Sequence, residues 1–578
     1  MSGATRFPVE VTIERDVPAA MRDGTILYAD IYRPTSDGPL PALLMRLPYD
    51  KVGAQTITYA HPIWYARQGF LVIVQDVRGR GRSEGEFYPF RHEAEDGYDT
   101  VEWAATVPGC NGAVGMFGFS YVGVTQLLPA LLRPPHLVTI APAFTNDGYY
   151  EGWTYRSGAL NLAFAMSWAT SLAPDTARRR GQAGLEASLA GTFADIAPWY
   201  WFLPLRDFPI LQQEAVAPYF YDWLEHPTDD PYWQEWEIAR RYPDIAVPAL
   251  HIGGWYDVFL EGTLRNFRGL REQAGSAEAR RRQRLVIGPW YHMPWTQQVG
   301  AVDFGPEAQN SIDDLQVRWF SHWLKGEDNG MVDEPPVRLF VMGENRWRDE
   351  EEWPIARAVE TPLHLHSDGR ANSASGNGTL SAAAPTEEYP DIFVYDPAAP
   401  VPSLGGHSCC FPQIAPMGPA DQRSVEARND VLVYTGEVLT RDLEVTGPVH
   451  VILWAASTAV DTDFTAKLVD VYPDGTAVNL CDGLIRARFR DSLRRPEPIV
   501  PDRVYEFPIQ VGSTSNLFRA GHRIRLEISS SNFPQYDRNL NTGEGVGMGS
   551  LAGRITATQT IFHDAEHPSR LVLPIIPR

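Results

Sequence analysis

The stretch Gly115-Met116-Phe117-Gly118-Phe119-Ser120-Tyr121-Val122-Gly123 decides the fold of this chain. Apolar residues run into Gly118, which is typical of a buried strand, and residues 121–132 carry apolar side chains at helical spacing. A serine between such a strand and helix stands on a tight turn that exposes its hydroxyl, and the helix N-terminus favours negative charge nearby. Ser120 is therefore a candidate nucleophile. The second glycine follows the serine by three residues, not by the two of the common G-x-S-x-G pattern, so a purely structural turn is the competing interpretation.

The composition indicates a large folded protein. A chain of 578 residues corresponds to about three or four domains or subdomains, and 44% hydrophobic residues can build sizeable cores. The net charge of −22 argues against nucleic acid or an anionic membrane as a partner. No run has the apolar length of a membrane span, and the first eight residues do not resemble a signal peptide, so we expect a cytoplasmic protein.

The four cysteines are too few for a disulfide scaffold in a chain of this length. Cys409 and Cys410 are adjacent and could form a vicinal disulfide, but two free thiols are the expected state. No Cys/His cluster has metal-ligand spacing, and we expect neither a metal nor a cofactor.

Strand and helix patterns alternate along the first part of the chain, which predicts a doubly wound α/β sheet. Expected strands cover residues 26–32, 42–46, 70–75, 114–117 and 137–142, and expected helices cover 57–68 and 93–105. Residues 146–244 then show helical patterns, including 153–172 and 232–242, with no strand pair, which predicts a lid inserted in the α/β domain. The alternation resumes with strands at 247–254 and 284–288 and helices at 259–273 and 313–325.

The last part of the chain reads as an all-β domain. Beyond about residue 330 the chain consists of short strand patterns, beginning with Val337–Met342, separated by turns with pairs such as Asp474-Gly475. This pattern predicts a sandwich of two sheets.

Two later strands end in residues that could complete a catalytic triad with Ser120. A serine nucleophile needs a histidine base and a carboxylate that orients the base, and in α/β-hydrolases the carboxylate precedes the histidine in the chain. Asp257 follows the apolar strand near residue 250, and His292 follows the one near residue 285. Taken singly, Asp257 could be a helix cap and His292 a loop residue, but their order and positions favour the triad.

The oxyanion of an attacked carbonyl needs hydrogen-bond donors. The backbone N–H of Tyr121 is the expected first donor, because it directly follows the nucleophile. The loop after the strand at 42–46 lacks the usual glycine-rich sequence, but Tyr49 can offer its phenolic O–H. A packing role is the alternative for Tyr49.

These segments resemble the cocaine esterase and X-Pro dipeptidyl-peptidase (CocE/NonD) family of serine hydrolases, which also contains α-amino acid ester hydrolases and cephalosporin acylases. The resemblance extends from the first strands to the start of the β domain, and a glycine three residues after the serine is normal in this family. The shared segments are Pro48-Tyr49-Asp50-Lys51, Asp76-Val77-Arg78-Gly79-Arg80-Gly81-Arg82-Ser83-Glu84-Gly85, Gly118-Phe119-Ser120-Tyr121-Val122-Gly123, Gly254-Trp255-Tyr256-Asp257 and Gly288-Pro289-Trp290-Tyr291-His292.

The resemblance implies a nucleophile (Ser120), a base (His292), an orienting carboxylate (Asp257) and two oxyanion donors (Tyr49 and Tyr121). It implies an α/β-hydrolase domain at 1–146 and 245–352, a helical cap at 147–244 and a C-terminal jelly roll at 353–578. It also suggests that residues 76–85 build the loop beside the active site, with arginines in structural ion pairs.

The substrate is the least determined part of the prediction. The amino acid ester hydrolases carry acidic residues two and three positions after the triad aspartate, where this chain has Phe259 and Leu260. Trp153, Trp168 and Phe259 fall where cocaine esterase has aromatic residues of its acyl pocket, which favours an ester with a bulky or aromatic acyl group. We therefore expect a small-molecule ester or amide as the partner, and a homo-oligomer stays open.

Two alternatives remain. An X-Pro dipeptidyl-peptidase needs a carboxylate for the substrate's free N-terminus, for which Asp147 and Glu151 are candidates, and a β-lactam or amide acylase belongs to the same family. A catalytically decayed protein that binds ligands through its jelly roll is an alternative of another class, although every triad position is filled.

Overall fold

The computed structural model describes residues 9–410 and 417–577. The first eight residues, which we expected to contain no signal peptide, lie outside the described residues. Within the described ranges, no helix is both long and apolar enough to cross a membrane.

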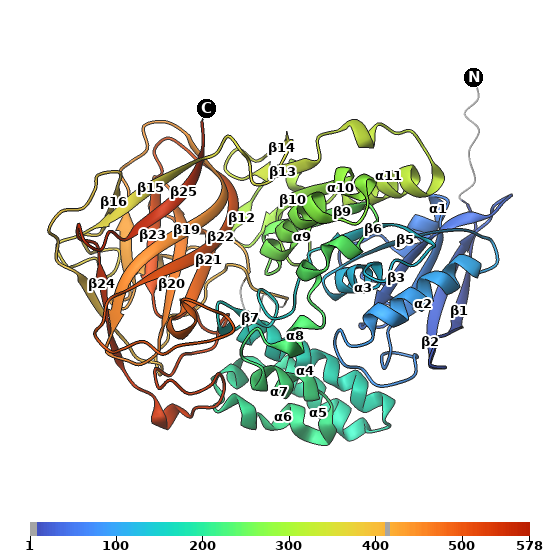
Figure 1. The fold of residues 1–578 in the computed structure, drawn as a ribbon, viewed down its shortest axis with the longest axis horizontal. Helices are drawn as coiled ribbons and strands as arrows, with labels where there is room; N and C mark the ends of the chain where they lie inside the picture. The colour runs from blue at the N-terminus through green and yellow to red at the C-terminus, as the bar shows by residue number, and fades with distance from the viewer. Residues whose placement is uncertain (1–8, 411–416, 578) are drawn as a thin grey trace.

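A ten-stranded sheet forms the centre of the N-terminal part of the chain (Figure 1). Its order is β1-β2-β4-β3-β5-β6-β9-β10-β13-β14. The neighbours from β4 to β13 pair in parallel, and the outer strands β1, β2 and β14 pair antiparallel. The strands are β1 (Val11–Ala20), β2 (Ile26–Pro34), β3 (Leu40–Leu47), β4 (Leu71–Asp76), β5 (Cys110–Phe119), β6 (Leu137–Ala143), β9 (Ala249–Tyr256), β10 (Gln283–Tyr291), β13 (Val337–Val341) and β14 (Arg346–Glu350).

Helices pack on both faces of this sheet because the side chains of its buried strands alternate between two apolar cores. In β3, Leu43 and Met45 belong to the core that also contains residues of α1 and α11. Ala42 and Leu44 belong to the core that contains residues of α2 and α3. The helices are α1 (Pro62–Arg67), α2 (Glu93–Thr106), α3 (Tyr121–Ala130), α9 (Leu260–Gln273), α10 (Ala277–Arg281) and α11 (Ile312–Lys325), and a short hairpin of β11 (Gln298–Val299) and β12 (Val302–Asp303) lies between α10 and α11 in the chain.

Residues 144–248, between β6 and β9, are mainly helical. They contain α4 (Leu162–Arg179), α5 (Ala183–Ala194), α6 (Pro209–Gln212), α7 (Pro218–Glu225) and α8 (Pro231–Gln234). They also contain one strand pair that the sequence analysis did not predict, β7 (Tyr155–Arg156) with β8 (Ala159–Leu160). We call this segment the helical insertion.

Three predicted elements differ from the structure. The helix expected at 57–68 begins at Pro62, because a proline suits the first helical position and the His61 ring caps it by accepting the N–H of Ile63. The helix expected at 153–172 begins at Leu162, after the unpredicted hairpin, and the one at 232–242 gives way to 3-10 turns after Gln234.

The C-terminal part is an all-β domain (Figure 1), whose described residues contain eleven strands, one short α-helix, α12 (Arg423–Glu426), and two 3-10 turns. The pattern at 337–342 resembles the short strands of this domain, but β13 pairs in parallel with β10 and so belongs to the first sheet, within the expected bounds 245–352 of the α/β domain. The strands are β15 (Val359–His366), β16 (Thr379–Ser381), β17 (Asp391–Tyr395), β18 (Leu432–Thr435), β19 (Leu443–Ser457), β20 (Asp463–Val471), β21 (Ala477–Arg486), β22 (Tyr505–Phe518), β23 (Arg523–Ser529), β24 (Ala557–Phe562) and β25 (Arg570–Ile576).

Candidate active site

Ser120 stands on the turn between β5 and α3. Its backbone has φ 64° and ψ −131°, a combination that costs free energy in any residue other than glycine. The neighbouring structure holds this conformation, since the Ser120 N–H donates to the carbonyl of Ala143 on β6 at 2.9 Å. Tyr121 is the first residue of α3, so its N–H belongs to the first helical turn, which has no acceptor within the helix.

Close contacts around the turn explain why glycine stands at positions 118 and 123. Gly118 has φ 136°, and a Cβ there would come within 2.2 Å of the Val122 side chain. Gly123 lies in the first turn of α3, where a Cβ would come within 2.6 Å of the Thr145 side chain. The glycine three residues after Ser120 therefore lets α3 pack against the segment that follows β6.

Gln55 holds the residue before the nucleophile in place. Its side-chain amide donates to the carbonyl of Phe119 at 2.9 Å and accepts the Phe119 N–H at 3.0 Å. The sequence analysis did not identify Gln55, because a glutamine in a loop carries no recognisable motif.

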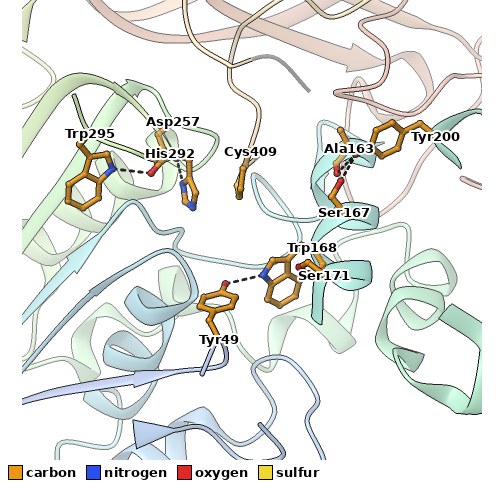
Figure 2. Close-up of a disulfide and its surroundings, with 11 residues drawn as sticks. Tyr49, Ala163, Ser167, Trp168, Ser171, Tyr200, Asp257, His292, Trp295 and Cys409 are labelled. Carbon is orange, nitrogen blue, oxygen red and sulfur yellow. Dashed lines mark hydrogen bonds and ion pairs between the residues drawn. A yellow bond between two sulfur atoms is a disulfide. The ribbon is translucent and has the colours of Figure 1, made fainter. Parts of the chain in front are cut away.

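His292 and Asp257 are brought together at the ends of the adjacent strands β10 and β9. The Nδ1 of His292 lies 2.7 Å from Oδ1 of Asp257, and both side chains are buried. Aromatic rings surround the imidazole, with the ring centroids of Phe259 and Phe119 at 5.2 and 5.5 Å. Trp295 donates its indole N–H to the His292 carbonyl at 3.0 Å (Figure 2). The bond to Asp257 leaves Nε2 of the imidazole for another partner.

Tyr49 joins the loop after β3 to the helical insertion. Its hydroxyl oxygen accepts the indole N–H of Trp168 on α4 at 3.0 Å (Figure 2). Burial of this hydroxyl raises the pKa of Tyr49 to about 12, against the opposing effect of hydrogen bonds with Trp168 and Ser120. Although 37% of the Tyr49 surface is exposed, its hydroxyl therefore points into the site as a neutral donor at ordinary pH.

The segment 76–85 supports the Tyr49 loop. The Asp76 carboxylate accepts the backbone N–H of Lys51 at 2.7 Å and that of Arg82 at 3.1 Å. Arg80 donates to the carbonyl of Pro48 at 2.8 Å and to that of Leu172 on α4 at 2.9 Å. The buried guanidinium of Arg80 therefore connects the loop before Tyr49 with the helix that carries Trp168.

A buried polar network lies beneath the start of α3. The Tyr121 hydroxyl donates to Glu93 at 2.9 Å and accepts the N–H of Phe90 at 2.9 Å. Glu93 in turn pairs with Arg46 at 3.0 Å. Burial raises the pKa of the Glu93 carboxyl, and the Arg46 charge opposes that shift. This network therefore holds Tyr121, the residue that directly follows Ser120, in place.

A cavity of about 340 Å³ contains the serine and the histidine. The residues that line it are Leu47, Tyr49, Asp50, Gly53, Gln55, Thr56, Ile57, Phe119, Ser120, Trp168, Ser171, His292, Met293 and Cys410. Of the three aromatic residues predicted for an acyl pocket, Trp168 lines this cavity. Trp153 and Phe259 do not line it, but they stack on each other with centroids 4.3 Å apart, and Phe259 also contacts the His292 ring.

Asp147 and Glu151 lie elsewhere. Both line a second cavity of about 310 Å³, which does not include Ser120. Asp147 pairs with Arg265 at 2.7 Å, and Glu151 accepts the Ser157 N–H at 3.0 Å.

The all-β domain reaches the site through the segment between β17 and α12. Cys409 and Cys410 on this segment form a vicinal disulfide, so the expectation of two free thiols is wrong. That expectation rested on the number of cysteines, which says nothing about the local backbone that joins neighbouring sulfurs. Cys409 is buried near His292, and Figure 2 shows it directed towards the space between His292 and Trp168.

Comparison with known proteins agrees with these features. Residues 23–294 match the family model of the X-Pro dipeptidyl-peptidase (S15 family), and residues 329–572 match that of the X-Pro dipeptidyl-peptidase C-terminal non-catalytic domain. The chain therefore belongs to the cocaine esterase and X-Pro dipeptidyl-peptidase family of serine hydrolases.

Individual relatives match along nearly the whole chain. The cocaine esterase of Rhodococcus sp. (strain MB1 Bresler) is 41% identical over 579 residues, which covers 98% of this chain and 99% of the relative. The crystal structure of an aminopeptidase from a marine sediment Thaumarchaeota archaeon superimposes with a TM-score of 0.81 at 25% identity. An α-amino acid ester hydrolase superimposes with a TM-score of 0.80 at 25% identity, and each of these two comparisons covers 100% of this chain and 98% of the other.

Proposed function

We propose that this chain hydrolyses carboxylic esters with Ser120 as the nucleophile, His292 as the base and Asp257 as the residue that orients the base. The observation that carries the proposal is the 2.7 Å contact between His292 and Asp257 beside a cavity that Ser120 also lines. The 41% identity to a cocaine esterase favours esters as the substrate class.

The proposed reaction passes through an acyl-enzyme. Ser120 attacks the ester carbonyl while Nε2 of His292 takes the hydroxyl proton. Asp257 accepts the Nδ1–H and stabilises the imidazolium that forms. The imidazolium then protonates the departing alcohol, and a water molecule repeats the same steps on the acyl-enzyme.

The oxyanion would lie between the Tyr49 hydroxyl and the Tyr121 N–H. The Tyr49 oxygen already accepts the Trp168 indole N–H, so its own hydrogen is free to be donated. The Tyr121 N–H lies at the start of α3, where the partial positive charge of the helix also favours an anion.

The cavity lining favours an uncharged, bulky acyl group. Its residues are mostly apolar or neutral, and Asp50 is the one carboxylate among those described. Asp147 and Glu151, the candidates for binding a peptide N-terminus, line the other cavity. We therefore place the X-Pro dipeptidyl-peptidase and the acylase second. No observation on the described residues supports a catalytically decayed binding protein, since the three proposed triad residues are all present.

We further propose the domain roles that the sequence suggested. Residues 1–146 and 245–352 would form the catalytic domain, and residues 147–244 a cap, whose helix α4 supplies Trp168 to the cavity. Residues 353–578 would form a jelly roll, with Cys410 contributing to the cavity wall.

A fluorophosphonate probe tests the nucleophile, and two substrates test the class. We expect the wild type to be labelled and Ser120→Ala not to be labelled. The rates with an aryl ester and with an Xaa-Pro anilide are then compared for the unlabelled wild type, because the probe blocks the serine, and the ester should be hydrolysed faster. A folded wild type that takes up no label would overturn the catalytic role, and a faster anilide would make the chain a peptidase.

A further inference from the structure

We propose that Cys409 and Cys410, once reduced, bind a thiophilic divalent cation such as Zn²⁺ together with His292. The bound cation would stop hydrolysis by occupying the imidazole nitrogen that activates the serine. Cation binding itself is independent of the proposed function, whereas the inhibition rests on the proposed role of His292.

The geometry of the three side chains carries this inference. The two Sγ atoms and a ring nitrogen of His292 all lie within 4.8 Å of one another. Zinc binds thiolate at about 2.3 Å and imidazole at about 2.0–2.1 Å, so two donors on one ion can be no more than about 4.6 Å apart. In the disulfide the two sulfurs are closer together than two ligands of one zinc ion, so after reduction the cysteine side chains would rotate until the sulfurs lie about 3.8 Å apart, the separation of two thiolates on a tetrahedral ion. Two thiolates with one imidazole are also the donors that zinc prefers.

The hydrogen bonds around His292 leave the correct nitrogen available. Nδ1 is held by Asp257 at 2.7 Å, so the neutral ring carries its proton there and presents the lone pair of Nε2. A carboxylate on the second nitrogen is also the usual support of a zinc-bound histidine, because it fixes the ring and raises its basicity.

The cysteines are anchored where the ligands would be needed. Gly406 and Gly418 exchange two backbone hydrogen bonds of 2.7 and 3.0 Å at the base of their segment. The His407 ring bridges Asp482 at 3.0 Å and the carbonyl of Trp255, at the end of β9, at 2.9 Å. These contacts attach the segment to the strand that precedes Asp257 and do not involve the sulfurs, so reduction of the disulfide removes none of them.

The oxidation state decides whether the site exists. In the disulfide the sulfurs are bonded to each other and offer no thiolate. A dithiol such as dithiothreitol breaks the S–S bond, transfers two electrons and two protons to give two Cys thiols, and leaves as its own cyclic disulfide. Cation binding then releases the two thiol protons to the buffer.

The first test uses Co²⁺ as a spectroscopic substitute for Zn²⁺ with the full-length chain. The reduced and desalted wild type should develop the near-ultraviolet absorption of a thiolate–Co²⁺ bond at one equivalent, and the oxidised wild type should not. The Cys409→Ser and Cys410→Ser variants should bind more than about tenfold more weakly. Cys110→Ser is the matched control, because Cys110 is a half-buried free cysteine outside the site, and it should behave like the wild type.

The second test measures the rate of aryl-ester hydrolysis with added Zn²⁺, relative to the rate of the same preparation without Zn²⁺. Zn²⁺ should inhibit the reduced wild type and the Cys110→Ser variant, a chelator should restore their rates, and the oxidised wild type should resist. Alkylation of the reduced wild type with iodoacetamide should give the same resistance without a mutation. Two outcomes would overturn the proposal: a folded protein whose thiol count does not rise on reduction, or equal Co²⁺ binding by the wild type and the cysteine variants. Binding without inhibition, in a protein whose Ser120 takes up the fluorophosphonate probe, would overturn the inclusion of His292 among the ligands.

Discussion

The indole N–H of Trp168 on α4 donates to the hydroxyl oxygen of Tyr49, on the loop after β3, at 3.0 Å. This bond joins the helical insertion to the α/β domain at the cavity that contains Ser120. Since the tyrosine oxygen accepts this hydrogen, the tyrosine's own hydrogen remains available to another acceptor. The insertion therefore contributes to the orientation of the proposed oxyanion donor as well as to the cavity wall.

Replacing Tyr49 by phenylalanine should lower kcat by about a hundredfold, because it removes one donor to the oxyanion. Trp168→Phe should give a smaller loss of kcat, since the tyrosine hydroxyl remains but loses its fixed direction. Steady-state hydrolysis of an aryl ester measures both. Tyr389→Phe is the control, because Tyr389 is 76% exposed and belongs to the all-β domain. A Tyr49→Phe variant near the wild-type rate would remove the assignment.

Asp257→Asn should lower kcat by about ten thousandfold while the protein stays folded. The asparagine amide can donate to Nδ1, which would stabilise the imidazole with its proton on Nε2, where it cannot accept the serine proton. Circular dichroism checks the fold, and single-turnover acylation locates the lost step. A loss of less than tenfold would show that Asp257 does not orient the base.

Gly123→Ala should destabilise the protein by about 1–3 kcal/mol, because the added Cβ would come within 2.6 Å of the Thr145 side chain. Gly191→Ala is the matched control: Gly191 lies inside α5 with no atom within 4 Å of the added Cβ, so this change should stabilise the helix by about 0.5–1 kcal/mol. Urea unfolding of the three proteins measures the difference. Equal midpoints for Gly123→Ala and the wild type would contradict the packing argument.

Glu237→Gln should stabilise the protein relative to the wild type, and this stabilisation should be larger at pH 8 than at pH 4. Burial, followed by the charges of Asp229 and Asp147, raises the pKa of Glu237 to about 7 from its ordinary 4.5. Between these two values the folded chain binds more protons at this site than the unfolded chain, so stability falls as the pH rises through that interval. The glutamine removes this loss, worth about 1 kcal/mol after allowance for solvent screening. Thermal unfolding midpoints at both pH values measure it, and an equal effect at both would refute the shift.

Asp50→Asn should change substrate preference only if the cavity accepts ammonium groups. Asp50 is the one carboxylate among the described residues that line the cavity. For the proposed esterase we expect kcat/KM of an uncharged aryl ester to change by less than about threefold, since no charge of that substrate would be lost from contact. A selective loss for substrates with a free α-amino group would instead favour an aminopeptidase or an amino acid ester hydrolase.

The order of elements in the α/β domain could be predicted because its buried strands are continuous apolar runs. The strand before Ser120 and the helix after it are both present at the predicted place, as β5 and α3. The bond between His292 and Asp257 was expected from their positions after two such strands, and the structure brings the pair to 2.7 Å. The catalytic roles of these residues stay predictions.

Other parts of the site depend on contacts that a local pattern does not contain. Gln55 holds Phe119 across 64 residues of chain, and Arg80 joins Pro48 to Leu172. The Trp153 ring stacks on Phe259 and also packs edge-on against Trp168 with centroids 6.2 Å apart, an arrangement that follows an unpredicted hairpin, and its role in an acyl pocket stays a prediction. The disulfide between Cys409 and Cys410 depends on the local backbone of a loop in the all-β domain.

The position of Cys410 in the cavity wall has a consequence for the time at which the enzyme is completed. Ser120 and Cys410 line the same cavity although 290 residues separate them in the chain. At about 5–20 residues per second, a ribosome needs about 15–60 s to make that interval. A nascent chain can therefore carry Ser120 and its turn while one side of the pocket has not yet been translated, and the cavity wall is complete only after residue 410 has been made.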